Sequence, residues 1–276
     1  MGLVFYNTEV SDDEYKQIKN YMLPLLLDVS NYFKIKLSEV RWNHVYEFAE
    51  DILNYDIIFH DFGPIISKQF SGRTKLIDGE VSIIINSNEL HKKERQHFTL
   101  MHEIVHSYIH IKNSVHPIFA SSTRNLSPEN VQVEIEADIG ASILMANDKA
   151  LQHELEENKS FYSLCNKFSC SYSSMFMRLR NFLCFEYNMS GIAATYFVRE
   201  FQNWSNNSLN IFVKYAEVLF LDYVSYLRLE GISENYNSLE KIEDFIDWNL
   251  DVRTSEKTID TLSNYIAYRL EEYIYV

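Results

Sequence analysis

The feature that most constrains this chain is a His-Glu-x-x-His motif at residues 102–106, set among apolar residues that recur at helical spacing. On an α-helix, His102 and His106 lie one turn apart and project from the same face. Two imidazoles placed in this way can bind one Zn²⁺, and Glu103 beside them can accept a proton from a water molecule. The motif therefore predicts a helix with one side packed on the protein and one side that holds a metal.

A β-hairpin is predicted directly before this helix. Asp78-Gly79 separates two β-branched runs, residues 75–77 and 80–86, and Asp-Gly is a strong turn signal between strands. The second run is nearly all apolar, so we expect a central, covered strand that leads into the motif helix. Further elements are expected as helices over 11–34, 42–54 and 128–145, and as a strand over 57–59. The pattern predicts an α+β region in which a small sheet packs on the motif helix.

The rest of the chain is predicted to be helical, since no proline follows Pro128. Residues 158–184 have the outline of a helix-turn-helix, and long helical patterns cover 192–228 and 238–276. We therefore expect a domain over 1–190 that includes this segment, and a helical region over 191–276. The helical region is either a packed extension of the core or a docking region for a substrate or partner.

A third metal ligand is needed, because a catalytic zinc site takes three protein ligands and one open position. The candidates are His97, His110, His116 and the acidic residues of 134–138. Three ligands spaced by four residues on one straight helix cannot all converge on one ion, which disfavours His110. A second helix that crosses the first is the better geometry, and it offers Glu134. The alternative for Glu134 is a solvated surface acid.

Other residues near the motif are candidates for supporting roles. Asp138, one turn after Glu134, can accept the second hydrogen bond of a ligating histidine. Glu136 is expected on a different face, solvated or capping. His110 and Tyr108 can donate a hydrogen bond to a developing oxyanion, although His110 fits equally a buried, hydrogen-bonded histidine.

These motifs, taken together, resemble the ImmA/IrrE family of metallopeptidases. The resemblance is carried by Arg95-x-x-Phe98-Thr99-Leu100-x-His102-Glu103-x-x-His106-x-x-x-His110, by Glu134-x-Glu136-Ala137-Asp138-x-x-Ala141-Ser142-x-Leu144-Met145, and by Leu164 to Ser169 with Ser173 to Leu179. It covers about residues 40–184. The family's Leu-Leu-Met-Pro ending reads Leu144-Met145-Ala146-Asn147 here, and the helices after about 190 match nothing assignable.

The resemblance implies a zincin-like fold, with Zn²⁺ held by His102, His106 and Glu134 and with Glu103 as general base. It also implies a protein substrate: site-specific cleavage of a helix-turn-helix transcriptional repressor in phage, mobile-element or stress control. The alternative is a zinc-binding regulatory protein that acts by binding a partner without proteolysis. The retained Glu103 disfavours this alternative, because a structural zinc site needs no general base.

Charge and composition exclude several other classes. The net charge of −14 repels phosphate, so direct binding of nucleic acid or of anionic membranes is not expected. The basic residues of 158–184 are too few for a DNA-reading module. Three cysteines make no disulfide framework, and no stretch reaches the ~18 apolar residues of a membrane span. The N-terminus lacks a basic, apolar leader, and we expect a cytoplasmic protein.

Overall fold

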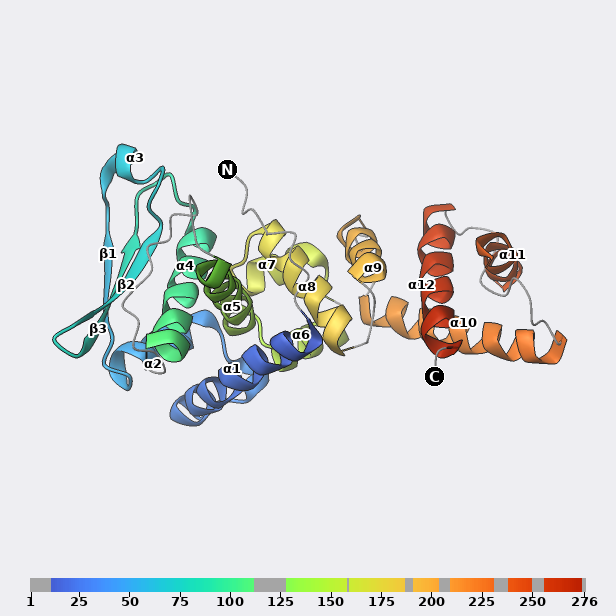
Figure 1. Cartoon of the computed structure of the whole chain (residues 1–276), viewed down its shortest axis with the longest axis horizontal. Helices are drawn as coiled ribbons and strands as arrows, with labels where there is room; N and C mark the ends of the chain where they lie inside the picture. The colour runs from blue at the N-terminus through green and yellow to red at the C-terminus, as the bar shows by residue number, and fades with distance from the viewer. Residues whose placement is uncertain are drawn as a thin grey trace. The chain divides into compact units, whose positions relative to one another are not determined.

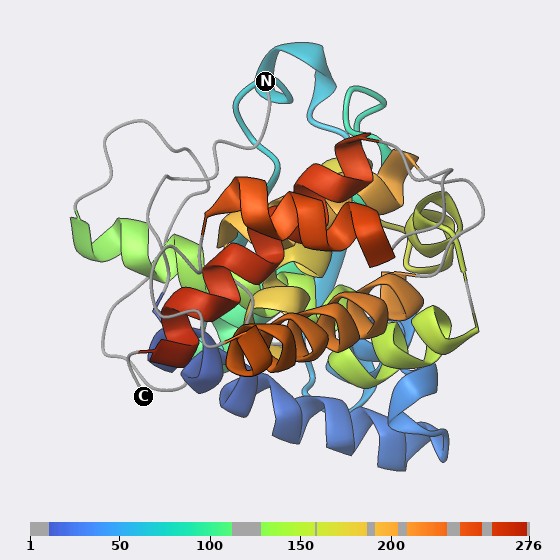
Figure 2. The same ribbon diagram turned by 90° about the vertical axis from the view of Figure 1, so that its right-hand side faces the viewer.

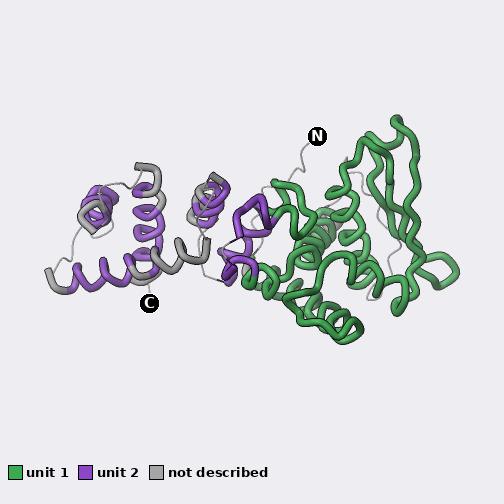
Figure 3. Tube along the Cα trace, turned by 180° about the vertical axis from the view of Figure 1, so that it is seen from behind, with its two compact units in different colours: residues 1–153, 165–175 green, residues 154–164, 176–276 purple. Residues whose placement is uncertain are grey.

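The computed structural model describes residues 11–111, 128–157, 159–186, 191–203, 209–230, 238–249 and 256–274. The chain forms two compact units, residues 1–153 with 165–175 and residues 154–164 with 176–276 (Figure 3). The helices are α1 (Asp12–Phe33), α2 (Trp42–Asp51), α3 (Gly63–Ile66), α4 (Lys93–Val105), α5 (Pro128–Met145), α6 (Asp148–Glu156), α7 (Phe161–Lys167), α8 (Tyr172–Glu186), α9 (Gly191–Asn203), α10 (Leu209–Glu230), α11 (Leu239–Asn249) and α12 (Glu256–Ile274). The strands are β1 (Asp56–His60), β2 (Gly72–Ile77) and β3 (Glu80–Asn86), and short turns of helix are η1 (Leu37–Glu39) and the π-helical η2 (His106–Ile111).

The sheet of the first unit has the order β1-β3-β2, with β1 parallel and β2 antiparallel to the central strand β3 (Figure 1). Asp78 and Gly79 connect β2 to β3, and their φ angles of 53° and 88° are both positive. A two-residue hairpin turn of this kind matches the twist of the strands and favours Asp-Gly. The predicted hairpin and its covered central strand are therefore confirmed.

Helix α4 follows the sheet in the chain and packs against β2 and β3. Ile83 and Ile85 of β3 are fully buried, as are Leu100, Met101 and Val105 of α4. At Gly72 the strand and the helix come so close that an added Cβ would lie 2.5 Å from the Thr99 Cγ2 atom. The absence of a side chain at residue 72 thus lets the sheet approach the helix that carries the His-Glu-x-x-His motif.

Helix α1 begins where the sequence predicts, at a capping box. Ser11 Oγ accepts a hydrogen bond from the Glu14 backbone N–H, and the Glu14 carboxylate accepts one from the Ser11 N–H at 2.9 Å. The buried face of α1, including Met22 and Val29, packs against α2 and α5 (Figures 1 and 2). The first unit therefore has the expected zincin-like α+β arrangement, in which helices and a small sheet enclose the motif helix.

The second unit is helical in the part that the structure describes, as expected. Helix α12 packs against α9, α10 and α11, and aromatic rings fill the interior between them. Tyr265 is fully buried, with its ring edge-on to Phe197 at a centroid distance of 5.4 Å. The helix-turn-helix outline of residues 158–184 appears as α7, a short turn and α8. None of the described helices is both long enough and apolar enough to cross a membrane.

The division of the chain at residue 190 remains a prediction. The sequence also predicts a break between helices at residues 231–235, an irregular stretch around 113–123 and a helix N-cap at Ser127, and these positions lie outside the described residues.

Candidate metal centre

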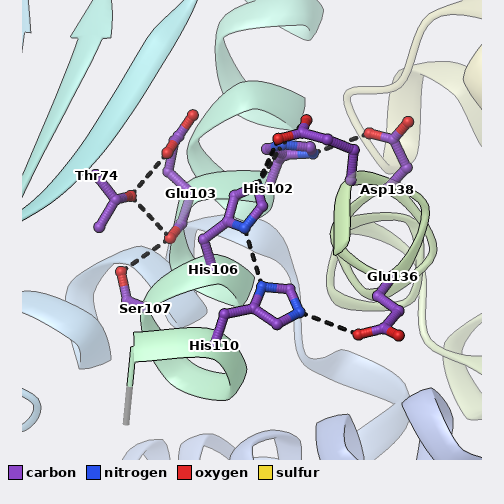
Figure 4. Close-up of polar contacts among 9 residues, drawn as sticks. Thr74, His102, Glu103, His106, Ser107, His110, Glu136 and Asp138 are labelled. Atoms are coloured by element: carbon purple, nitrogen blue, oxygen red, sulfur yellow. Dashed lines mark hydrogen bonds and ion pairs between the residues drawn. The ribbon is translucent and has the colours of Figure 1, made fainter. Parts of the chain in front are cut away.

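His102 and His106 lie side by side at the C-terminal end of α4, as the motif predicts (Figure 4). Their Nε2 atoms are 2.9 Å apart, and both side chains are buried. His106 is also the first residue of the π-helical turn η2, so the helix widens directly after the motif. Such wide turns occur mostly at functional sites.

Helix α5 brings Glu134 to these two nitrogens. One carboxylate oxygen of Glu134 lies 3.3 Å from His102 Nε2 and the other lies 3.6 Å from His106 Nε2. The three candidate ligand atoms all lie within 4.8 Å of one another, and all three residues are buried. The expectation that a crossing helix offers Glu134 matches this geometry, whereas a solvated surface acid does not.

The two helices can approach this closely because residue 140 has no side chain. A Cβ added at Gly140 of α5 would lie 2.9 Å from both Cγ atoms of Val105 on α4. Contacts this short would force the helices apart. The small residues of α5 predicted to allow close helix packing therefore act at Gly140.

Asp138 accepts a hydrogen bond from His102, at 2.9 Å between Nδ1 and Oδ1 (Figure 4). In the neutral ring, which is the form that binds a metal, this bond places the proton on Nδ1, so that Nε2 would present a lone pair toward Glu134 and His106. Asp138 thus occupies the supporting position that the sequence suggested.

Glu103 is buried beside the histidines and is held by the sheet. Thr74 Oγ1 of β2 lies 2.7 Å from Glu103 Oε2, to which it donates, and 3.1 Å from the Glu103 carbonyl oxygen. Ser107 Oγ also donates to that carbonyl oxygen, at 2.9 Å. Burial raises the pKa of Glu103, and the positive charge on His102 and the hydrogen bond from Thr74 oppose this effect. Glu103 is therefore a buried carboxylate with a fixed orientation.

Residues 50–180, which contain all of these side chains, match the family model of the IrrE N-terminal-like domain, a peptidase domain. This range is therefore a domain of the ImmA/IrrE family. A search of curated proteins finds no match to the chain. The matched range extends from α2 into α8, so it contains the whole of the sheet, α4 and α5.

The donor set of this ImmA/IrrE domain fits a divalent metal such as zinc. Two imidazole nitrogens and one carboxylate converge from two helices, which is the three-ligand set of a catalytic zinc site. The pKa values of the two histidines shift in opposite directions. Burial disfavours a charge on His102, but Asp138 and Glu134 outweigh it and raise the pKa of His102 well above its ordinary value. Burial and the neighbouring rings lower the pKa of His106, which therefore stays neutral.

The remaining predicted site residues are placed differently. His110 contacts His106 and Glu136, so it is a part-buried, hydrogen-bonded histidine, the second of the two interpretations of the sequence. Glu136, expected to be solvated or capping, is 30% exposed, and its carboxylate also lies 3.1 Å from His110 Nε2. Burial and the charge of Asp28 on α1 raise the pKa of Tyr108, and its role as an oxyanion donor stays a prediction.

Two candidate ligands are not part of the group. His97 stacks on Trp42 at a centroid distance of 3.7 Å, where its buried Nδ1 atom has no hydrogen-bond partner. His116 lies outside the described residues. The contact of Thr74 with the Glu103 carboxylate was not predicted from the sequence. Its only signal is the buried alternation of Gly72 and Thr74 along β2, which does not identify a partner on a later helix.

Proposed function

We propose that this protein is a zinc-dependent endopeptidase. The observation that carries the proposal is the convergence of His102, His106 and Glu134 on one point beside the buried Glu103. Membership of a peptidase family supports the reaction type, and the donor set supports zinc.

The chain's own residues have separate tasks in this proposal. His102, His106 and Glu134 would hold the zinc ion, which would supply Lewis acidity to the attacking water and the scissile carbonyl. Glu103 takes the proton of the attacking water and passes it to the leaving amine. Thr74 holds one Glu103 oxygen at 2.7 Å, which fixes the carboxylate for this transfer. Burial raises the pKa of Glu103, which makes the carboxylate a better proton acceptor.

The proposed substrate is a transcriptional repressor of the helix-turn-helix type or a similar regulatory protein, which the ImmA/IrrE resemblance implies. The net charge of −14 supports recognition of the repressor itself, since it disfavours binding to the repressor's DNA. Such a substrate is intracellular, and we place the protein's work in the cytoplasm. Helices α9 to α12 are proposed to dock the substrate or a partner.

A comparison of the wild type with Glu103→Gln tests the proposal. This substitution keeps the shape of the side chain but removes the general base, so zinc stays bound while peptide hydrolysis stops. Both forms are produced in the protein's own cells, and new protein N-termini are identified by mass spectrometry. We expect one or a few N-termini, within a repressor, that form only with the wild type.

Identical N-termini with both forms would contradict the peptidase. If Glu103→Gln also left the biological effect of the protein unchanged, a zinc-binding protein that acts by partner binding would replace the proposal. Glu47→Gln, an exposed position on α2, is the matched control and should behave as the wild type.

A further inference from the structure

His106 is the first member of a chain of hydrogen bonds that leads away from the candidate metal centre. Its Nδ1 atom lies 2.9 Å from His110 Nδ1, and His110 Nε2 lies 3.1 Å from a Glu136 carboxylate oxygen (Figure 4). The His110 side chain is 11% exposed and that of Glu136 is 30% exposed. The three side chains therefore form a partly enclosed series from η2 to α5.

Only one arrangement of protons allows His106 to bind a metal through the nitrogen that faces the other ligands. That nitrogen is Nε2, which lies 2.9 Å from His102 Nε2 and 3.6 Å from Glu134. The proton of a neutral His106 is then on Nδ1, which donates to Nδ1 of His110. His110 in turn carries its proton on Nε2 and donates it to Glu136, so each contact has one donor and one acceptor.

Glu136 is itself held in place from the other side. Gln132 Nε2, one turn earlier on α5, lies 3.4 Å from the second oxygen of Glu136 and 3.2 Å from Glu14 Oε1 on α1. The carboxylate that ends the series thus has a defined position between α5 and α1.

We propose that Glu136 positions His106 through His110, as Asp138 positions His102 directly. The inference rests on the proposed zinc site. Hydrogen bonds to the outer nitrogen of a ligating histidine fix its tautomer and the direction of its lone pair, and a carboxylate at the end increases its basicity. Helix α5 then supplies one ligand, Glu134, and also orients both histidines of α4. The π-helical turn that begins at His106 is the element that brings the His110 ring against that of His106.

Zinc affinity of the full-length protein, measured by competition with a chelator, tests this positioning role. We expect His110→Phe and Glu136→Ala each to weaken zinc binding by about 10- to 100-fold, the usual effect of losing such a hydrogen bond. Because Glu136 acts only through His110, the double variant should bind zinc no more weakly than His110→Phe alone. His110→Phe combined with Asp138→Ala should instead multiply the two losses, since these residues orient different rings.

Histidine ¹⁵N NMR spectra of the zinc-loaded wild type provide a measurement that needs no variant. The proposal requires a proton on Nδ1 of His106 and on Nε2 of His110, and a proton on Nδ1 of His110 would overturn it. Equal zinc affinity of the wild type, His110→Phe and Glu136→Ala would also overturn it while leaving the proposed function intact. A wild type that binds no zinc would instead contradict the proposed function. Glu47→Gln serves as the control for loss of one acidic charge and should not change zinc affinity.

Discussion

The helix pair α4 and α5 of the first unit and the pair α10 and α12 of the second bury opposite kinds of side chain. Tyr265 of α12 is fully buried and contacts Glu217 of α10, while Glu217 and Arg269 meet at side chains 33% and 24% exposed. Between α4 and α5 the buried residues include His102, His106 and Glu134. Burial of ionisable groups costs free energy unless they are paired. The second pair is therefore built for stability, and the first gives up stability to place ligands.

The largest expected effect is the loss of one of these ligands. Glu134→Ala removes the only carboxylate ligand of the group, so we expect zinc affinity to fall by more than the ~100-fold of a supporting residue. Zinc content and chelator competition measure the change. Glu240→Ala, an exposed acid on α11, is the control and should keep about one zinc per chain. If Glu134→Ala bound zinc as tightly as the wild type, the third ligand would be another residue.

A smaller effect is expected at the point where α4 and α5 touch. Gly140→Ala places a Cβ 2.9 Å from Val105, and overpacking of this kind costs about 1–3 kcal/mol of stability even though alanine favours helix. Because the same contact sets the distance of Glu134 from the histidines, zinc affinity should fall too. Urea unfolding and chelator competition measure the two effects.

A second substitution that removes the Val105 Cγ atoms tests whether the contact between residues 140 and 105 sets the helix spacing. Val105→Ala in the background of Gly140→Ala removes the clashing Cγ atoms, so the double variant should regain part of the zinc affinity. An additive loss of affinity in the double variant would show that the helices are not spaced by this contact.

The smallest effect is expected on the pH dependence of stability, through His97 of α4, whose Nδ1 atom is buried. Burial lowers the pKa of His97, so below pH about 6.5 the unfolded chain binds a proton that the folded chain does not. His97 therefore makes the protein less stable as pH falls from 6.5 toward the lowered folded-state pKa. His97→Phe should keep the stack on Trp42 and remove this part of the pH dependence.

Urea unfolding at pH 7.5 and pH 5.5 measures this difference. His44 and His91 also have pKa values lowered by burial, so some pH dependence should remain in the variant. A larger loss of stability at pH 5.5 in His97→Phe than in the wild type would contradict the prediction.

Local chemistry explains which parts of the structure the sequence could predict. The start of α1 depends on Ser11 and Glu14, and the turn between β2 and β3 depends on Asp78 and Gly79. Each pair acts within a few residues of the chain, and both predictions are confirmed. Glu134 could be predicted as a candidate ligand because two histidines on one helix require a third ligand from another element.

The residues that the sequence did not assign depend on contacts between distant segments. Thr74 precedes Glu103 by 29 positions, and only the packing of β2 on α4 joins them. Glu136 was expected to be solvated or capping because it lies on a different face of its helix from Glu134, and its contact with His110 could not be read from that spacing. The π-helical turn has no signature in the spacing of apolar residues.

The division of the ligands between α4 and α5 has a consequence for folding. A zinc ion that joins His106 to Glu134 would close the 27 residues of chain between them into a loop, and would so act as a cross-link. By the chain-entropy estimate for a disulfide, closing a loop of this length stabilises the folded state by about 3–4 kcal/mol. Zinc binding and the folding stability of the first unit would then be coupled. In cells short of zinc, this unit would be less stable and the protein would be degraded more easily.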